Sequence, residues 1–164
     1  MQHTFEPVYN QQSKILILGT FPSVKSREAN FYYGHPQNRF WKVLAAILNV
    51  SVPETVEEKK QMLLTHGIAI WDVIASCEIT GSSDASIHEV KPNDISPILK
   101  AAPIRAVFAN GAKAEELYIK YIQPLTNVPI RRLPSTSPAN AASSLNRLIE
   151  IWGELIGPFM RLQK

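Results

Sequence analysis

The sequence contains a single cysteine, Cys77, and the lack of a second thiol excludes an internal disulfide. This usage is typical of a reducing compartment, so we expect a cytoplasmic protein. Cys77 and the four histidines form none of the CxxC, HxxxH or HxE spacings of metal sites, and we expect no metal ion. No apolar run approaches the ~18 residues of a membrane-spanning helix. Residues 1–7 lack the basic-then-apolar layout of a secretory signal.

The net charge is also small, because the 17 lysines and arginines are nearly balanced by 14 acidic residues, which leaves a formal net charge of +3. That is only a mild preference for polyanionic partners. The basic residues are nevertheless grouped at two candidate loops, one flanked by Lys25, Arg27, Arg39 and Lys42 and the other by Arg131 and Arg132. Solvated surface charge explains these positions equally well.

The 164 residues, 45% of them hydrophobic, suffice for one domain with a full core, which we place at residues 1–164. Four apolar segments are typical of strands: 14–19, 68–73, 105–109 and 128–133. Five segments show helical patterns: 39–48, 53–65, 93–102, 111–121 and 141–156. The polar segment 76–89 is predicted to be a loop. This alternation predicts an α/β fold, a three-layer αβα sandwich around a short, mostly parallel four-stranded sheet.

Ligands of such sheets bind beyond the carboxyl ends of the strands, which here means the loops after Gly19 and after Leu133. The first loop has neither a GxGxxG nor a GxxxxGK[ST] pattern, so nothing supports a dinucleotide or P-loop site. Instead the segment FYYGHPQNRFW at 31–41 interleaves aromatic, amide and basic residues. Rings stack on bases, amides pair with base edges and cations hold phosphates. The pattern favours nucleic-acid binding, although Phe40 and Trp41 also suit the buried face of a helix.

Several segments, in order along the chain, resemble one family of DNA repair enzymes. GHPQNRFWKV at 34–43 is similar to the HPANRFWKV segment of the mismatch-specific uracil-DNA glycosylases, which belong to the uracil-DNA glycosylase superfamily. GTFPS at 19–23 stands where that family has GINPG, and LPSTSPAN at 133–140 resembles its second motif, close to LPNPSGLS. NGAKA at 110–114 resembles its strand–GKxA–helix junction. The resemblance covers most of the chain and implies the same fold.

One position departs from the family pattern. The residue before the proline of the first motif is Asn or Asp in the family, where it positions or activates the attacking water, but here it is Phe21. GTFPS, YYGHPQNRFW and the polar segment 81–87 resemble the hypoxanthine-DNA (deoxyinosine) glycosylase branch of the superfamily. Resemblance to that branch moves the catalytic role to the amide of the GHPQN segment and implies that Asn38 is the catalytic residue.

The resemblance also implies the other contacts of the site. Tyr33 takes the slot of the family's base-stacking phenylalanine. Asn38 is expected to hold a water near the sugar carbon through its carbonyl oxygen while its amide group donates to another acceptor. The expected base-binding residues are Gly19, Thr20, Phe21, Ser23, Tyr33 and His35. The expected DNA-binding residues, with Pro138 to Asn140 as wedge candidates, are Arg39, Lys113, Arg132, Ser135, Thr136, Ser137, Pro138 and Asn140. Two roles stay open: His35 contacts the ligand or bonds within its own loop, and Asp72 acts as a base or caps a neighbouring loop.

We therefore expect a monofunctional DNA glycosylase that hydrolyses the N-glycosidic bond of a flipped deaminated base, hypoxanthine first, in base excision repair. It needs no metal or organic cofactor. Its expected partner is DNA containing a deaminated base, its state is a monomer, and its place is the cytoplasm, at the nucleoid in a prokaryote. The alternatives are a mismatch-type uracil-DNA glycosylase, a catalytically silent DNA-binding module of the same fold, and an unrelated small-molecule α/β enzyme.

Overall fold

The computed structural model describes residues 5–21, 31–79 and 87–160 and is built around a four-stranded sheet. The strand order is β2-β1-β5-β6, with β1 at Ile15–Gly19, β2 at Ile68–Asp72, β5 at Ala106–Asn110 and β6 at Ile130–Leu133. All three neighbouring pairs are parallel. The predicted strands are confirmed, except that β6 begins after Pro129, which has no N–H group for a ladder.

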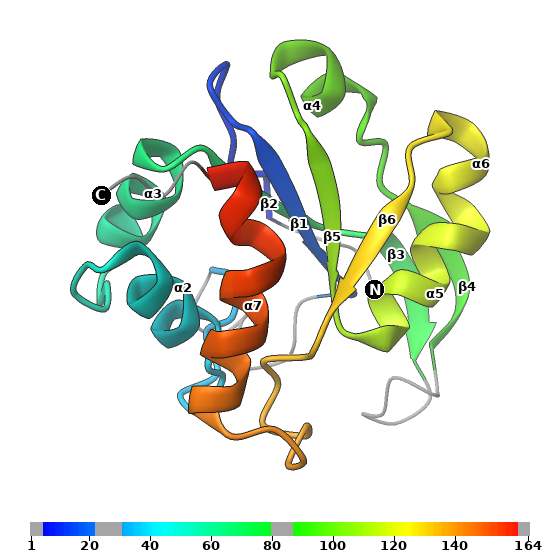
Figure 1. The fold of residues 1–164 in the computed structure, drawn as a ribbon. Coiled ribbons are helices and arrows are strands. Elements are labelled where there is room, and N and C mark those ends of the chain that lie inside the picture. The colour runs from blue at the N-terminus through cyan, green and yellow to red at the C-terminus, as the bar shows by residue number, and fades with distance from the viewer. Residues whose placement is uncertain (1–4, 22–30, 80–86, 161–164) are drawn as a thin grey trace.

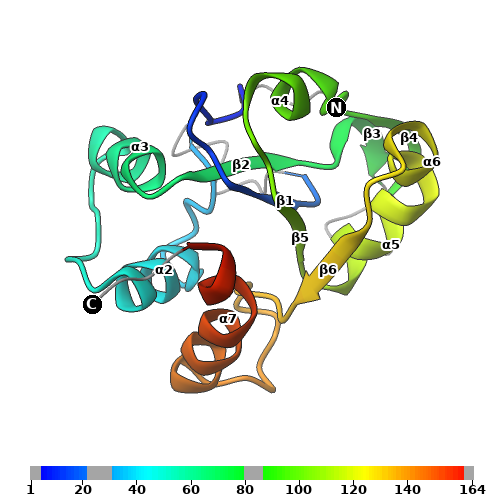
Figure 2. The ribbon, with the colours of Figure 1, turned by 45° about the horizontal axis from the view of Figure 1, so that its top comes forward.

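Helices cover both faces of this sheet (Figures 1 and 2). One layer holds α2 (Phe40–Leu48), α3 (Val56–Thr65) and α7 (Leu145–Met160), and the other holds α4 (Ser96–Ala101), α5 (Ala112–Tyr121) and α6 (Gln123–Thr126). In β1, Ile15 and Ile17 pack with the first layer, whereas Leu16 and Leu18 pack with the second. A strand buried on both faces has to be apolar at successive positions, as β1 is. The predicted three-layer αβα sandwich is confirmed.

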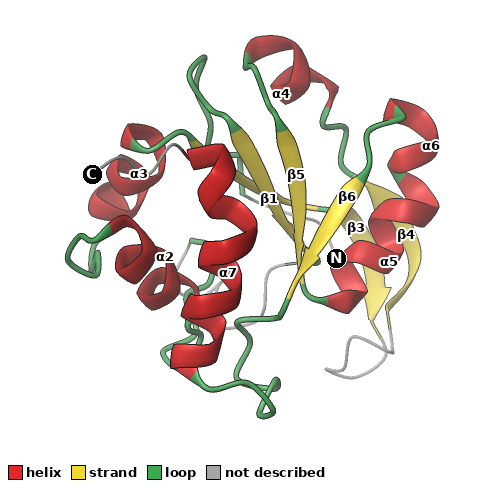
Figure 3. Ribbon diagram, in the orientation of Figure 1, coloured by secondary structure: helices red, strands yellow, loops and turns green. Residues whose placement is uncertain are grey.

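The prediction of a loop at 76–89 is wrong for the described part of that segment, residues 76–79 and 87–89. β3 (Ile74–Ile79) and β4 (Ile87–Pro92) pair antiparallel in a second, two-stranded sheet, drawn in yellow in Figure 3. Residues 80–86 lie outside the described part of the chain. Small and polar residues interrupt the apolar alternation here, and the pairing itself shows register shifts, so the usual period-two signal of a strand was absent from the sequence.

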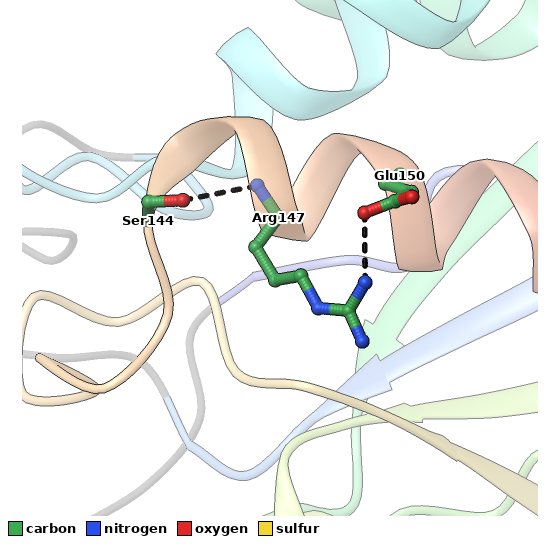
Figure 4. Close-up of polar contacts among 3 residues, drawn as sticks. All are labelled: Ser144, Arg147 and Glu150. Carbon is green, nitrogen blue, oxygen red and sulfur yellow. Dashed lines mark hydrogen bonds and ion pairs between the residues drawn. The ribbon is translucent and has the colours of Figure 1, made fainter.

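Helix α7 begins later and ends later than the predicted segment 141–156. Ser144 sets the start, because its Oγ accepts a hydrogen bond from the Arg147 N–H at 3.1 Å, as the N-cap of a helix does (Figure 4). The extension to Met160 continues a single buried stripe at helical spacing. That stripe consists of Leu148, Trp152, Ile156 and Met160.

The boundaries of α3 follow the sequence signals more closely. Thr55 Oγ1 accepts from the Glu58 N–H at 3.0 Å, and the Glu58 carboxylate accepts from the Thr55 N–H at 3.2 Å, which is a capping box. Gly67, with φ 73°, follows the helix, in the left-handed conformation that glycine adopts just past many helix ends. Helix α6 was not predicted. Among the described residues no helix has the length and apolar character to cross a membrane.

Candidate active site

Two strands end in polar residues at the carboxyl edge of the sheet, β2 in Asp72 and β5 in Asn110. Gly19 of β1 is in register with Asp72 of β2, and Asn110 of β5 is in register with Leu133 of β6. The two loops singled out by the sequence leave or approach this edge, and they meet through a hydrogen bond between Thr136 and Asn38. The site predicted at the carboxyl ends of the strands therefore brings both family motifs together.

The side chain of Asn38 is held in one orientation. Its Oδ1 accepts hydrogen bonds from the Phe40 N–H at 2.9 Å and from Thr136 Oγ1 at 2.9 Å. A backbone N–H can only donate, so the atom that faces Phe40 must be the oxygen of the carboxamide. Both lone pairs of Oδ1 are thus in use, and Nδ2 is the group left to bind a ligand. The expectation that the carbonyl oxygen holds a water does not fit this geometry.

Thr136 lies between Asn38 and a residue that the sequence did not identify, Asn110. Thr136 is completely buried. Its Oγ1 accepts from Asn110 Nδ2 at 3.0 Å, and its N–H donates to Asn110 Oδ1 at 3.1 Å. A buried hydroxyl that is already bonded on both sides cannot contact a phosphate, so the assignment of Thr136 to DNA binding is wrong. Asn110 had two signals in the sequence, its place at the end of an apolar strand and its position in the NGAKA segment at 110–114, but neither identified it as a site residue.

Arg39 was also predicted to bind DNA, and the structure gives its guanidinium another task. The guanidinium donates to four backbone carbonyls of the loop after β6, those of Thr136, Ser137, Asn140 and Ser143. The Arg39 N–H donates to the carbonyl of Thr136 as well, at 3.1 Å. With these donors bound inside the protein, Arg39 clamps the loop against the start of α2. Four of its five N–H donors are thereby used within the protein, and its contact with a DNA phosphate stays a prediction.

Gly19, Tyr33 and Asp72 approach one another closely beside this network. A Cβ on Gly19 would lie 2.5 Å from Asp72 Oδ1 and 2.9 Å from the Tyr33 hydroxyl, so only glycine fits. The Tyr33 ring stacks on Phe40 at 3.9 Å between centroids, and its backbone has a φ of 53°. Burial and the Asp72 carboxylate raise the pKa of the Tyr33 phenol, while Asn110 lowers it by less. Tyr33 is thus neutral and offers an O–H.

The Tyr33 hydroxyl is buried, and among the described residues no group meets it with good hydrogen-bond geometry, although the Asn110 amide lies near enough to lower the pKa of the phenol. Burying an unpaired hydroxyl costs free energy, so Tyr33→Phe should leave the free energy of unfolding unchanged or raise it by about 1 kcal/mol. Urea unfolding measures this. Tyr32→Phe is the matched control, because the Tyr32 hydroxyl donates to the Glu6 carbonyl at 2.7 Å and its loss should cost about 1 kcal/mol. Equal destabilisation by both substitutions would show that Tyr33 has a partner.

The remaining predicted base-binding residues are placed as follows. His35 Nδ1 accepts from the Gln37 N–H at 3.0 Å, so His35 is bonded within its own loop and its neutral form carries the proton on Nε2. Thr20 and Phe21 are half-buried, and Phe21 packs against the core on the α5 side of the sheet. Ser23 lies outside the described residues, as do Lys25 and Arg27.

A groove of about 460 Å³ opens where β6 ends and α5 begins. Its lining includes three predicted DNA-binding residues, Arg132, Ser135 and Asn140. Arg132 is more than half exposed. It forms an ion pair at 3.5 Å with Glu115, which lies in the first turn of α5. The Ser135 carbonyl accepts from Asn140 Nδ2 at 2.9 Å, and Ser135 Oγ accepts from the Ser137 N–H. The loop is therefore folded on itself.

The rest of this loop is available to a partner. Pro138 and Ala139 are exposed, as a wedge would have to be, while Ser137 Oγ accepts from the Ala139 N–H at 3.1 Å. Lys113, on the first turn of α5, is partly exposed and lies 3.5 Å from Glu116.

Asp72 is buried at the end of β2, and its backbone carbonyl accepts from Asn93 Nδ2 at 2.9 Å. Among the described residues, no three His, Cys, Asp or Glu side chains gather as metal ligands do.

Comparisons with known proteins bear on this arrangement. The profile of the family described as the uracil DNA glycosylase superfamily matches residues 6–156. Two proteins named hypoxanthine DNA glycosylase are similar to the chain. The one from Methanosarcina acetivorans is 34% identical over 148 residues, 87% of this chain and 90% of that protein. The one from Methanosarcina barkeri is 32% identical over 114 residues, 68% of this chain and 72% of that protein.

A solved structure is similar along almost the whole chain. It is a solution NMR structure of a Methanosarcina acetivorans protein assigned to the uracil DNA glycosylases, with a TM-score of 0.81 and 32% identity. The match covers 99% of both chains. The fold, the order of the motifs and these relatives agree with the resemblance inferred from the sequence. The chain belongs to the uracil DNA glycosylase superfamily.

Proposed function

We propose that this protein is a DNA glycosylase that removes hypoxanthine from deoxyinosine in base excision repair. The observation that carries the proposal is the fixed carboxamide of Asn38, whose Oδ1 is bonded to Phe40 and Thr136 so that Nδ2 is left for a ligand. The two Methanosarcina relatives named hypoxanthine DNA glycosylase support it, since the chain matches most of their length. No step of the proposed chemistry requires a metal or an organic cofactor.

The chemistry of deamination explains why a fixed donor suits such a site. Deamination replaces an exocyclic amino group, which donates hydrogen bonds, by a carbonyl oxygen, which accepts them. Asn38 Nδ2 is proposed to donate to that oxygen, and it cannot accept from the amino group of adenine. The departing base also gains negative charge, which a fixed N–H donor stabilises. Asn38 therefore favours hypoxanthine over its parent base.

Phe21 is the residue that favours hypoxanthine over uracil. It stands in the slot where the mismatch-specific enzymes carry a water-positioning Asn or Asp, and a phenyl ring cannot bind a water in that way. Release of uracil opposite guanine is the second candidate. The solved structure assigned to the uracil DNA glycosylases supports it, and the donor of Asn38 suits the uracil carbonyl oxygens equally well.

DNA would lie across the loop after β6 and the groove beside it. Arg132, Lys113 and the hydroxyls of Ser135 and Ser137 are proposed phosphate contacts. The exposure of Arg132 and the partial exposure of the other three support this. Pro138 and Ala139, both exposed, are proposed as the wedge that replaces the flipped base, with Asn140 beside them. Acting on one flipped nucleotide, the enzyme is proposed to work as a monomer, in the compartment that holds the DNA.

The test is a panel of labelled duplexes, each with a single deoxyinosine, deoxyuridine, deoxyxanthosine or ethenoadenine. After incubation with the protein, alkali cleaves the strand at any abasic site. We expect scission at deoxyinosine to be fastest. Faster scission at deoxyuridine would replace the proposal by the uracil activity. Salt-sensitive duplex binding with no scission at any base would identify a silent DNA-binding module, and absence of binding at low salt would exclude DNA as the substrate.

A further inference from the structure

We infer that Thr136 and Asn110 are positioning residues that fix the Asn38 carboxamide as a hydrogen-bond donor toward the flipped base. The inference rests on the proposed function and concerns how its central residue is oriented. A carboxamide can turn by 180° and exchange its oxygen for its NH₂ group. The two orientations have nearly the same shape but opposite hydrogen-bonding character, so the surroundings must decide between them.

The surroundings form a chain of hydrogen bonds with backbone N–H groups at both ends. At one end the Thr136 N–H donates to Asn110 Oδ1, which places Asn110 Nδ2 against the Thr136 hydroxyl. The hydroxyl accepts there, so its single proton is given to Asn38 Oδ1. At the other end the Phe40 N–H donates to the same oxygen. Because a backbone N–H cannot accept, the direction of every bond in the chain is determined.

Burial adds to the strength of this arrangement. Thr136 is completely buried, and reversing Asn38 would place its NH₂ group against the Phe40 N–H, a contact between two donors. A donor left unpaired away from water costs more than a typical hydrogen bond contributes. Arg39 holds the carbonyl of Thr136 from the other side, so the Thr136 hydroxyl stays next to Asn38. The loop proposed to contact DNA is thereby joined directly to the proposed catalytic amide.

Thr136→Val tests this series of hydrogen bonds, because it removes the Thr136 hydroxyl. It nearly keeps the side-chain shape and leaves the backbone N–H that binds Asn110. In single-turnover assays on a deoxyinosine duplex, we expect the rate of base release to fall about tenfold or more, the factor that corresponds to the loss of one or two hydrogen bonds. The dissociation constant for the duplex should change by less than about threefold, since Thr136 does not reach the DNA. Thr136→Ser, which keeps a hydroxyl, should restore most of the rate.

Asn110→Asp separates positioning from mere support of the loop. The carboxylate still accepts from the Thr136 N–H, but its second oxygen accepts from the Thr136 hydroxyl, which then no longer donates to Asn38. A supporting role would leave the rate unchanged, whereas the inferred role predicts a loss similar to that of Thr136→Val. Thr126→Val is the matched control, because Thr126 is also hydrogen-bonded and partly buried but lies on α6. It should keep the full rate.

The outcomes distinguish this inference from the proposed function. If the unmodified protein releases no hypoxanthine, the proposed function is wrong. If it does, and both Thr136→Val and Asn110→Asp keep the full rate, the inferred role of Thr136 and Asn110 is wrong. Should Thr136→Val fail to fold, Asn110→Asp and Thr136→Ser still test the inference. Full activity of Asn110→Asp overturns it. Loss of activity in Asn110→Asp, with activity kept in Thr136→Ser, supports it.

Discussion

Asn38→Ala is expected to slow hypoxanthine release by about 100-fold to 1,000-fold while duplex binding is largely retained. This is the range observed when one fixed donor to a developing negative charge is removed. Alanine deletes Nδ2, which is the group of Asn38 that remains for a ligand, and also the oxygen that accepts from Phe40 and Thr136. Single-turnover release from a deoxyinosine duplex and the dissociation constant of the same duplex measure the two parts of the prediction.

Asn38→Asp is the control that separates these two losses. Aspartate keeps an oxygen for the Phe40 N–H and the Thr136 hydroxyl, so the start of α2 and the loop contact are preserved. It replaces the donor NH₂ by a second acceptor oxygen, however, and repels a base that leaves with negative charge. We expect Asn38→Asp to be as slow as Asn38→Ala. A rate for Asn38→Asp close to that of the unmodified protein would show that Asn38 only caps the helix.

Arg39→Met is expected to lower the free energy of unfolding by roughly 3 kcal/mol, because hydrogen bonds to a charged group contribute more than neutral ones and several are lost together. The guanidinium donates to four carbonyls, including Ser137 at 2.8 Å and Asn140 at 2.9 Å. Arg39→Lys should lose most of this stability as well, since an ammonium group cannot reproduce the planar array of donors. Urea unfolding of the three proteins measures these differences.

Arg147→Met is the matched control for the loss of an arginine. Arg147 pairs with Glu150 at 2.7 Å on the exposed surface of α7 (Figure 4), and such a pair contributes about 0–1 kcal/mol. If Arg39 bound DNA phosphates instead of the loop, Arg39→Lys would be as stable as the unmodified protein and only the salt dependence of DNA binding would change. That result would overturn the role assigned to Arg39.

Neighbouring residues of one motif thus have different tasks. Asn38 joins the start of α2 to Thr136 through its Oδ1, and Arg39 holds the loop that carries Thr136. Phe40 supplies both an N–H for Asn38 and a ring for Tyr33 to stack on. The motif works as a unit because it stands at the start of α2, where the chain changes from loop to helix and free N–H groups are available.

Much of the fold was determined by local sequence. The apolar run at 14–19 predicted β1, and the helical pattern at 111–121 predicted α5, whose buried side consists of Ala114, Leu117 and Tyr118. Patterns of this kind arise from neighbours a few positions apart, so they can be recognised in the sequence. The β3–β4 hairpin was missed, because its pairing depends on contacts between strands and its residues do not alternate clearly.

The candidate site could be predicted from the sequence only in part. The motifs identified the segments around Gly19, Asn38 and Leu133, but tertiary structure alone decided which atom of Asn38 faces the ligand. Thr136, the partner that fixes it, is 98 positions away along the chain. Arg39 is basic in the sequence and would bind a phosphate as readily as a carbonyl; the folded loop supplies four carbonyls first. Residue type gives the capacity to donate or accept, and the partner brought close by the fold decides how that capacity is used.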